Sequence, residues 1–215
     1  MAFEGGGYRC SDLKEFIFDN ERVDTSLILN FVNQIAAGLE YLHLHKVLHK
    51  DLAARNCFLN PHTGVVRLSK SGLGMCRYPN DYTQMMPAAV SSSANTITIS
   101  MLKNSSAGIC TGLTPVRWLS PETLSTGVYR VSTDVYMFGV LIWELFSSGD
   151  RPYDEFSDED TVQEILNENK LICPGTCPVQ VWNIVEQCWV VPGCQRPLSA
   201  LIRRNLRLLT AELET

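Results

Sequence analysis

The sequence has no long apolar run, no excess of basic residues and no charged-plus-apolar signal segment at its start. Its longest apolar run, residues 135–146, contains Glu144 and is too short to cross a bilayer, so we expect a buried helix there. Lysine and arginine total 18 against 23 acidic residues, which gives a net charge of −5. Because non-specific nucleic-acid binding needs a basic surface, we expect no nucleic-acid partner and no membrane contact by this chain.

Patterns typical of metal, disulfide and phosphate sites are also missing. None of the eight cysteines belongs to a C-x-x-C pair, and no histidine cluster with zinc-finger spacing accompanies Cys173 and Cys177. Cys173 and Cys177 are separated by three residues, and without a secretory signal we interpret all eight cysteines as reduced thiols that behave mostly as small apolar residues. The glycines at positions 5–7 match neither phosphate-loop pattern, so we interpret them as a linker.

The 215 residues are 45% hydrophobic, which is enough for one domain or for one large lobe of a bigger domain. Apolar residues fall at helical spacing from Asp24 to His45, and again in the ranges 135–145, 162–166, 181–188 and 201–209. Residues 57–59 and 65–68 are predicted strands around an Asn-Pro-Gly turn. The fold class we expect is mostly α with a short β-hairpin.

One region breaks this pattern. Residues 84–112 are rich in serine, threonine, alanine and asparagine, and they show no sustained periodicity. Such a composition cannot bury enough apolar surface to order itself, so we expect a disordered insertion over 84–112.

Residues 48–57 (Leu-His-Lys-Asp-Leu-Ala-Ala-Arg-Asn-Cys) lie between a predicted helix and a predicted strand. Asp51 and Asn56 stand five apart on this loop and can direct two oxygen-bearing groups to one point. The stretch resembles the protein-kinase catalytic loop, in which the Asp takes the proton of the substrate hydroxyl and the Asn holds a magnesium ion. The continuation resembles the tyrosine-kinase branch, where Arg55 would help to hold the transferred phosphate.

Further motifs resemble the large lobe of a kinase, in the same order along the chain. The resemblance implies that His49 and Asp134 are structural, with Asp134 tying a central helix to the catalytic loop, and that Glu122 and Arg196 form a buried ion pair. The motifs are P-V-R-W at 115–118, S-P-E at 120–122 in place of A-P-E, S-T-D-V-Y-x-F-G-V at 132–140, C-W at 188–189 and R-P at 196–197.

The resemblance implies a protein-kinase-like fold with its C-terminal lobe only, the N-terminal lobe being absent. Residues 1–13 resemble the hinge, and residues 14–212 resemble the C-lobe with the 84–112 insertion in its activation segment. Without a small lobe above it, we expect the two strands to lack a third partner. We also expect the upper edge to expose apolar residues around Phe3, Leu59 and Leu68.

Three departures from the family bear on function. Lys70 stands where the family carries the metal-binding Asp of D-F-G, and magnesium takes oxygen ligands rather than an ammonium group. The Gly-rich loop, the β3-type lysine and the Glu-bearing helix that position the nucleotide phosphates are not found ahead of the hinge. Lys50 replaces the Arg of H-R-D and loses the bidentate geometry that grips a phosphotyrosine.

These features together resemble the catalytically impaired receptor tyrosine kinases of the colon-carcinoma-kinase (off-track) group, with the Ryk group close behind. Residues 78–83 resemble the Y-x-x-D-Y-Y activation-loop triplet shared with the neurotrophin, muscle-specific and Ror receptors, with Thr83 at the third tyrosine. Tyr78 and Tyr82 are therefore candidate phosphosites, although surface aromatics on a mobile loop fit the pattern equally well.

We therefore expect a tyrosine-kinase-like domain that is catalytically inactive and acts as a scaffold in receptor-type signalling, with no cofactor. Its partners would be signalling proteins, such as an active tyrosine kinase or a co-receptor, in the cytoplasm or at the cytoplasmic face of the plasma membrane. One alternative is an active tyrosine kinase that uses ATP and magnesium, holds the metal with Asn56 and has its N-lobe outside this chain. A metal-free nucleotide-binding switch using Lys70 and a truncated or mispredicted gene product also remain open.

Overall fold

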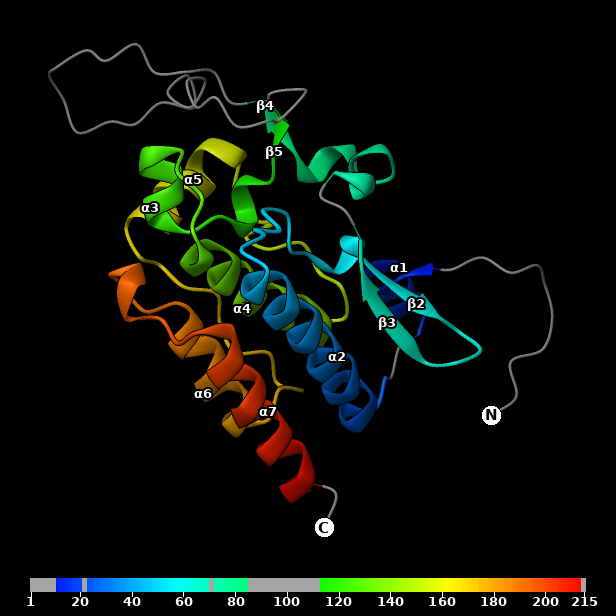
Figure 1. Cartoon of the computed structure of the whole chain (residues 1–215). Coiled ribbons are helices and arrows are strands. Elements are labelled where there is room, and N and C mark those ends of the chain that lie inside the picture. The colour runs from blue at the N-terminus through cyan, green and yellow to red at the C-terminus, as the bar shows by residue number, and fades with distance from the viewer. Residues whose placement is uncertain (1–10, 21–22, 70–71, 85–112, 214–215) are drawn as a thin grey trace, which may run out of the picture.

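The computed structural model describes residues 11–20, 23–69, 72–84 and 113–213 (Figure 1). Helices dominate this part of the chain, as the apolar periodicity predicts. In it, no helix is long and apolar enough to cross a membrane. The helices are α1 (Leu13–Asp19), α2 (Thr25–Leu44), α3 (Pro121–Thr126), α4 (Val131–Phe146), α5 (Asp158–Leu166), α6 (Val179–Cys188) and α7 (Ser199–Leu213).

A small antiparallel sheet lies beside the helices (Figure 1). The two predicted strands are present as β2 (Cys57–Asn60) and β3 (Val65–Leu68), with Cys57 opposite Leu68. A third strand, β1 (Ser11–Asp12), pairs with the other edge of β2. The expectation that the hairpin lacks a third partner is therefore wrong.

The apolar face of the sheet is covered by the helical core. Alternation along the strands turns Cys57, Leu59 and Val66 inward, and Leu59 is only 3% exposed. Leu68 is partly buried beside Gly38 of α2. The prediction of an exposed apolar edge is therefore wrong for Leu59, because helices rather than a second lobe cover that side; Phe3 lies outside the described residues.

The segment predicted as a hinge is described only from Ser11 onward. Asp12 ends β1, and its side chain accepts a hydrogen bond from the Glu15 amide at 2.9 Å, which caps the start of α1. Leu13 is thus the first residue of a helix, and it is buried together with Ile17 one turn later. These two apolar residues dock α1 on the core.

Helices α2 and α7 lie side by side along one flank of the molecule (Figure 1). The stripe of apolar residues predicted for α2 faces inward and is buried. Asn33 donates to the Thr210 hydroxyl at 2.7 Å, and Glu40 forms an ion pair with Arg203. Although their sequence positions are far apart, the first long helix and the last one form a single packed pair.

Helix α4 runs through the centre of the fold and is buried over most of its length, as the apolar run predicts. Gly139 permits a close approach by α6, because a Cβ atom there would lie 2.6 Å from Trp189 Nε1. The Trp189 indole N–H donates to the Tyr136 carbonyl at 3.2 Å. Two polar residues, Asp134 and Glu144, stand at opposite ends of this helix, and both bind backbone amides of residues 48–57, the loop that resembles a kinase catalytic loop and is called the catalytic loop below.

The segment after β3 contains short 3₁₀ turns, Leu73–Cys76 and Pro79–Asp81, followed by strand β4 (Thr83–Gln84). Strand β5 (Leu113–Thr114) pairs with β4, so the two ends of the segment predicted as an insertion come together. Gln84 belongs to β4, whereas residues 85–112 of that predicted insertion lie outside the described residues.

Candidate functional site

One carboxylate, that of Asp134, holds the backbone at the start of the catalytic loop. Asp134, in the first turn of α4, accepts from the His49 amide at 2.7 Å and from the Lys50 amide at 2.8 Å. His49 itself bridges the loop, because its Nε2 donates to the Ser69 carbonyl at 2.8 Å while its Nδ1 accepts from the Asp51 amide. These bonds fix the backbone that presents Asp51.

A partly buried histidine extends this support to the last helix. His43 Nε2 lies 3.2 Å from Asp134, and its Nδ1 lies 2.9 Å from the Ser199 hydroxyl. With Asp134 ionised, Nε2 carries the proton and Nδ1 accepts from Ser199. The start of α7 is therefore joined to the catalytic loop through His43 and Asp134.

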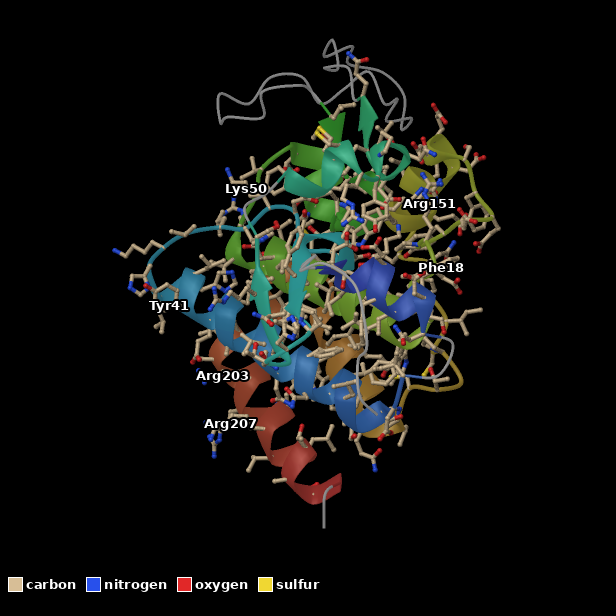
Figure 2. The ribbon with its side chains drawn as sticks, turned by 90° about the vertical axis from the view of Figure 1, so that its right-hand side faces the viewer. Phe18, Tyr41, Lys50, Arg151, Arg203 and Arg207 are labelled. Carbon is tan, nitrogen blue, oxygen red and sulfur yellow. The ribbon has the colours of Figure 1, made fainter. Side chains whose placement is uncertain are left out.

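The Lys50 backbone has φ 67°, in the left-handed region that a side chain other than glycine rarely adopts. The bonds from the consecutive His49 and Lys50 amides to Asp134 fix the backbone that leads into this residue. Its ammonium group lies 5.8 Å from the centre of the Tyr129 ring, and Figure 2 shows the side chain at the edge of the molecule. The Lys50 side chain therefore points away from the charged cluster around Asp51, although its backbone is part of the loop.

Both oxygens of the Asp51 carboxylate are engaged within the chain. Arg55 donates to Oδ1 at 2.8 Å. The Tyr82 hydroxyl donates to Oδ2 at 2.8 Å, and the Gly72 amide donates to the same oxygen at 3.0 Å. Tyr82 thus occupies the position at which a base would receive the hydroxyl proton of a substrate.

Arg55 is completely buried and links the loop to residues 72–84, the described start of the segment that resembles a kinase activation segment. Its guanidinium contacts the Tyr82 hydroxyl at 2.9 Å and Asp81 at 3.4 Å, and it lies 4.1 Å from the Trp118 ring and 4.5 Å from the Tyr82 ring. Burial opposes its charge, yet the carboxylates, Asp51 first, raise the pKa of Arg55 above its usual value. Arg55 is thus a permanent cation at the centre of the site.

Asn56 is also engaged on both sides of its amide. Its Nδ2 donates to the Asp51 carbonyl at 2.8 Å, and its Oδ1 accepts from the Gly74 amide at 3.0 Å. Gly74 is needed for this contact, because a Cβ atom there would lie 2.9 Å from the same oxygen. The side chain that would hold a metal in a kinase is used here to anchor the activation segment.

The described part of the site does not fit a magnesium ion. Asp51 and Asn56 both face N–H and O–H donors, which direct the positive ends of their dipoles toward the oxygens that a cation would need. Within the described ranges, no three His, Cys, Asp or Glu side chains form a group that could hold a metal. Lys70, the residue at the metal-ligand position in the sequence, lies outside those ranges.

The two candidate phosphosites are both tied to the lobe. Tyr82 is only 6% exposed, and burial raises its pKa to about 12. Tyr78 is partly buried, and its hydroxyl donates to Asp12 at 2.9 Å, while Arg77 pairs with the other oxygen of Asp12 at 2.6 Å. The interpretation of Tyr82 as a surface aromatic is therefore wrong, because its hydroxyl has buried polar partners that hold it inside.

Glu122 and Arg196 lie together as the resemblance implies. Two nitrogens of Arg196 contact the two Glu122 oxygens at 2.5 and 3.0 Å, and Arg196 also donates to the Ser132 and Val190 carbonyls. Burial opposes ionisation of Glu122, but the Arg196 guanidinium lowers its pKa on balance. The Glu122 side chain keeps 31% of its surface exposed, so only the arginine end of the pair is fully buried.

Two charged residues of the site carry no role in the sequence-based prediction. Glu144 accepts from the Ala54 amide at 3.0 Å and from Trp118 Nε1 at 2.8 Å, and burial raises its pKa to about 7. Arg117 pairs with Asp158 at 2.8 Å and donates to backbone carbonyls of residues 152, 153 and 156. Glu144 could have been noticed as the one acidic residue within the longest apolar run, because a buried carboxylate needs polar partners. Nothing in the sequence indicated the partners of Arg117.

A profile of the family described as protein tyrosine and serine/threonine kinase matches residues 7–206. The tyrosine-protein kinase transmembrane receptor Ror of Drosophila melanogaster is 30% identical over 201 residues, which are 91% of this chain and 26% of Ror. The human proto-oncogene tyrosine-protein kinase ROS is 33% identical over 178 residues, 81% of this chain and 7% of ROS. The chain thus spans about a quarter or less of the length of these relatives. Since the profile covers most of its residues, the chain belongs to the protein tyrosine and serine/threonine kinase family.

Proposed function

We propose that the chain is the C-terminal lobe of a receptor-type tyrosine-kinase-like domain that does not transfer phosphate and acts as a signalling scaffold. The observation that carries the proposal is the engagement of Asp51 and Asn56. Hydrogen bonds from Tyr82, Gly72 and Gly74 occupy the oxygens that a substrate hydroxyl and a metal ion would need.

The sequence at position 70 supports the same conclusion. Phosphoryl transfer depends on metal ions that bridge the nucleotide phosphates, and an ammonium group at the metal-ligand position cannot hold one. Asp51 acting alone as a base would accelerate phosphoryl transfer only a little, because most of the acceleration comes from positioning the reactants and stabilising the charge of the transition state. Within the family, we assign the chain to the impaired receptors of the colon-carcinoma-kinase or Ryk type.

The proposed scaffold works on the cytoplasmic side of a cell, at the plasma membrane if the chain is part of a receptor. Two matched relatives are receptor or proto-oncogene tyrosine kinases by name, which supports partners drawn from tyrosine-kinase signalling. An active tyrosine kinase or a co-receptor would dock on the folded lobe, with no cofactor needed. Tyr78 and Tyr82 are the proposed sites of phosphorylation by such a partner.

Restoring the missing metal ligand tests the proposal. We expect Mg-ATP to leave the melting temperature unchanged both in the wild-type chain and in Lys70→Asp, because Tyr82, Gly72 and Gly74 keep the oxygens of Asp51 and Asn56 engaged. Lys170→Asp, which changes the same charge at an exposed position, is the matched control. A magnesium-dependent shift in the wild type, with phosphopeptide formation abolished by Asp51→Asn, would contradict the proposal. A shift with ATP in EDTA that vanishes in Lys70→Ala would point to the metal-free switch.

A second candidate is an active tyrosine kinase whose site is closed by its own tyrosine. The 2.8 Å contact between the Tyr82 hydroxyl and Asp51 favours it, because a substrate tyrosine would make the same contact with a catalytic base. The two candidates differ in the response to Tyr82→Phe, measured in the longest available gene product with Mg-ATP and a tyrosine peptide. Phosphopeptide formation that rises in this variant would identify the active kinase, whereas we expect none in either protein.

A further inference from the structure

The loop between α5 and α6 carries two cysteines that do not behave as buried apolar residues. Cys57 and Cys188 are buried, as the sequence analysis predicts for cysteines in general, but Cys173 is exposed and Cys177 is partly exposed. The prediction of apolar behaviour is therefore wrong for Cys173, whereas Cys177 does pack partly buried against the apolar core. The two cysteines lie four residues apart in Cys-Pro-Gly-Thr-Cys.

A tight turn brings the two thiols together. The Cys177 amide donates to the Pro174 carbonyl at 2.9 Å, which folds the chain back over the intervening glycine and threonine. Cys173 is close enough to Cys177 to act electrostatically on its thiol. Each sulfur also lies near the carbonyl of the proline that follows it, at 3.6 and 3.7 Å. The turn therefore makes the two thiols neighbours at the surface.

Helix α4 holds this turn in place on both sides. The Trp143 indole N–H donates to the Ile172 carbonyl at 2.9 Å, just before the first cysteine. The Thr176 hydroxyl donates to the Phe146 carbonyl at 2.5 Å, just before the second. Because both anchors belong to one buried helix, the turn cannot open without breaking bonds to the core.

We propose that Cys173 and Cys177 form a redox modification site, which closes to an intramolecular disulfide in the presence of a hydroperoxide. Disulfides in the reducing cytosol are usually transient and redox-sensing. An exposed disulfide in a short ring is of the labile kind that cellular dithiols reopen. The chemistry at these cysteines does not involve Asp51, and only the reducing surroundings that would reopen the disulfide rest on the proposed function.

The chemistry needs hydrogen peroxide as the oxidant and releases water twice. The exposed Cys173 thiolate attacks one peroxide oxygen, the O–O bond breaks, and the other oxygen leaves as water after taking a proton, which leaves a sulfenic acid on Cys173. The Cys177 sulfur then attacks the Cys173 sulfur. The S–S bond forms, the S–O bond breaks, and the hydroxyl leaves as water with the proton of Cys177. In total, two thiols and one peroxide give one disulfide and two waters.

The second step has a characteristic pH dependence. Burial, together with the neighbouring Cys173, raises the pKa of Cys177 to about 12. Because the thiolate is the attacking species, ring closure should quicken by about tenfold for each pH unit between roughly pH 7 and 9.

The chain supplies its own control cysteines. Cys76 and Cys194 are exposed, and within the described residues neither contacts a second thiol. Peroxide can oxidise them to sulfenic acid or link them between molecules, and no cysteine of the described ranges stands ready to close an intramolecular ring with either. The difference between the two classes of exposed cysteine is therefore the readout.

The test treats the full chain with hydrogen peroxide, blocks free thiols with N-ethylmaleimide and maps the cysteines by mass spectrometry. We expect one peptide spanning 173–177 to be lighter by two hydrogens and unalkylated, and to regain both thiols with dithiothreitol. In Cys177→Ser, Cys173 should instead react with dimedone as a sulfenic acid.

Two outcomes would overturn the proposal. One is a wild-type chain in which Cys173 and Cys177 stay alkylated while Cys76 and Cys194 are oxidised. The other is oxidation of Cys173 only into links between molecules, seen on a non-reducing gel. Both are read on the wild type, so the conclusion does not depend on the folding of a variant.

Discussion

The side chains of Arg55 and Leu141 are equally buried, since neither has any exposed surface. Their neighbours, however, differ in chemical character. Arg55 lies among carboxylates, a hydroxyl and aromatic rings, whereas Leu141 lies in the apolar core along α4. In the first region each group depends on a specific partner, because a charge left alone in the interior is costly. In the second region any well-fitting apolar side chain serves. The site is therefore specified by pairing and the core by volume.

The largest expected effect comes from removing the cation. Arg55→Ala leaves the Asp51 carboxylate without its cationic partner inside the fold, and we expect a loss of about 4 kcal/mol in the free energy of unfolding. Urea titration measures it. Arg207→Ala, at an exposed arginine on α7 (Figure 2), is the control and should change the free energy by less than about 0.5 kcal/mol. Equal effects at the two positions would show that pairing does not hold the site.

Truncation in the core should cost somewhat less. Leu141→Ala removes buried methyl groups and leaves a cavity, and we expect a loss of about 3 kcal/mol. Leu201→Ala, at a leucine that is 46% exposed, is the matched control. The comparison sharpens with Leu141→Met, which should recover most of the loss because volume rather than pairing matters there. No recovery would mean that this part of the core also depends on specific shape.

Glu144 belongs to both regions, because it lies on α4 and binds the Ala54 amide of the site. Its pKa of about 7 should make the cost of an ionised group in the interior measurable as a change of stability with pH. The folded protein binds this proton more tightly than the unfolded chain, whose glutamate titrates near 4.5. The free energy of unfolding should therefore fall as pH rises from about 4.5 to about 7, by an amount on the order of 2 kcal/mol. Glu144→Gln should remove this part of the pH dependence, whereas Glu159→Gln, at an exposed position, should keep it.

The smallest effect is expected for a single hydroxyl. Tyr82→Phe keeps the ring over Arg55 but removes the bonds to Asp51 and Arg55, and we expect a loss of about 1 kcal/mol. Tyr41→Phe, on an exposed side chain (Figure 2), is the control and should be silent. A gain of stability in Tyr82→Phe would mean that burying the hydroxyl costs more free energy than its hydrogen bonds return.

The elements with strong periodicity could be predicted from the sequence, and the smallest ones could not. The stripes of α2, α4, α6 and α7 are long enough to reveal their period, and Asp24 and Ser157 mark two helix starts by capping. Strand β1 has only two residues and depends on β2 for its partners, so no local pattern could reveal it. Helix α1 did carry a signal, since Asp12 caps it and Leu13 and Ile17 lie one turn apart.

The candidate site shows the same division between local and distant information. Asp51, Arg55 and Asn56 are close in sequence, so their motif could be recognised directly. The contact between Asp51 and Tyr82 joins residues 31 positions apart, and that between Ala54 and Glu144 joins residues 90 apart. Such contacts depend on how the chain folds, so no spacing of residues in the sequence could predict them.

The bond between His43 and Ser199 has a consequence for how the protein is made. These residues are 156 positions apart, and together with Asp134 they underpin the loop that presents Asp51. A ribosome adds residues in order, so helix α2 and the catalytic loop emerge long before their support. The site cannot reach its final geometry until the start of α7 has left the exit tunnel. A nascent chain stalled before Ser199 would carry every residue of the catalytic loop without the complete framework that positions them.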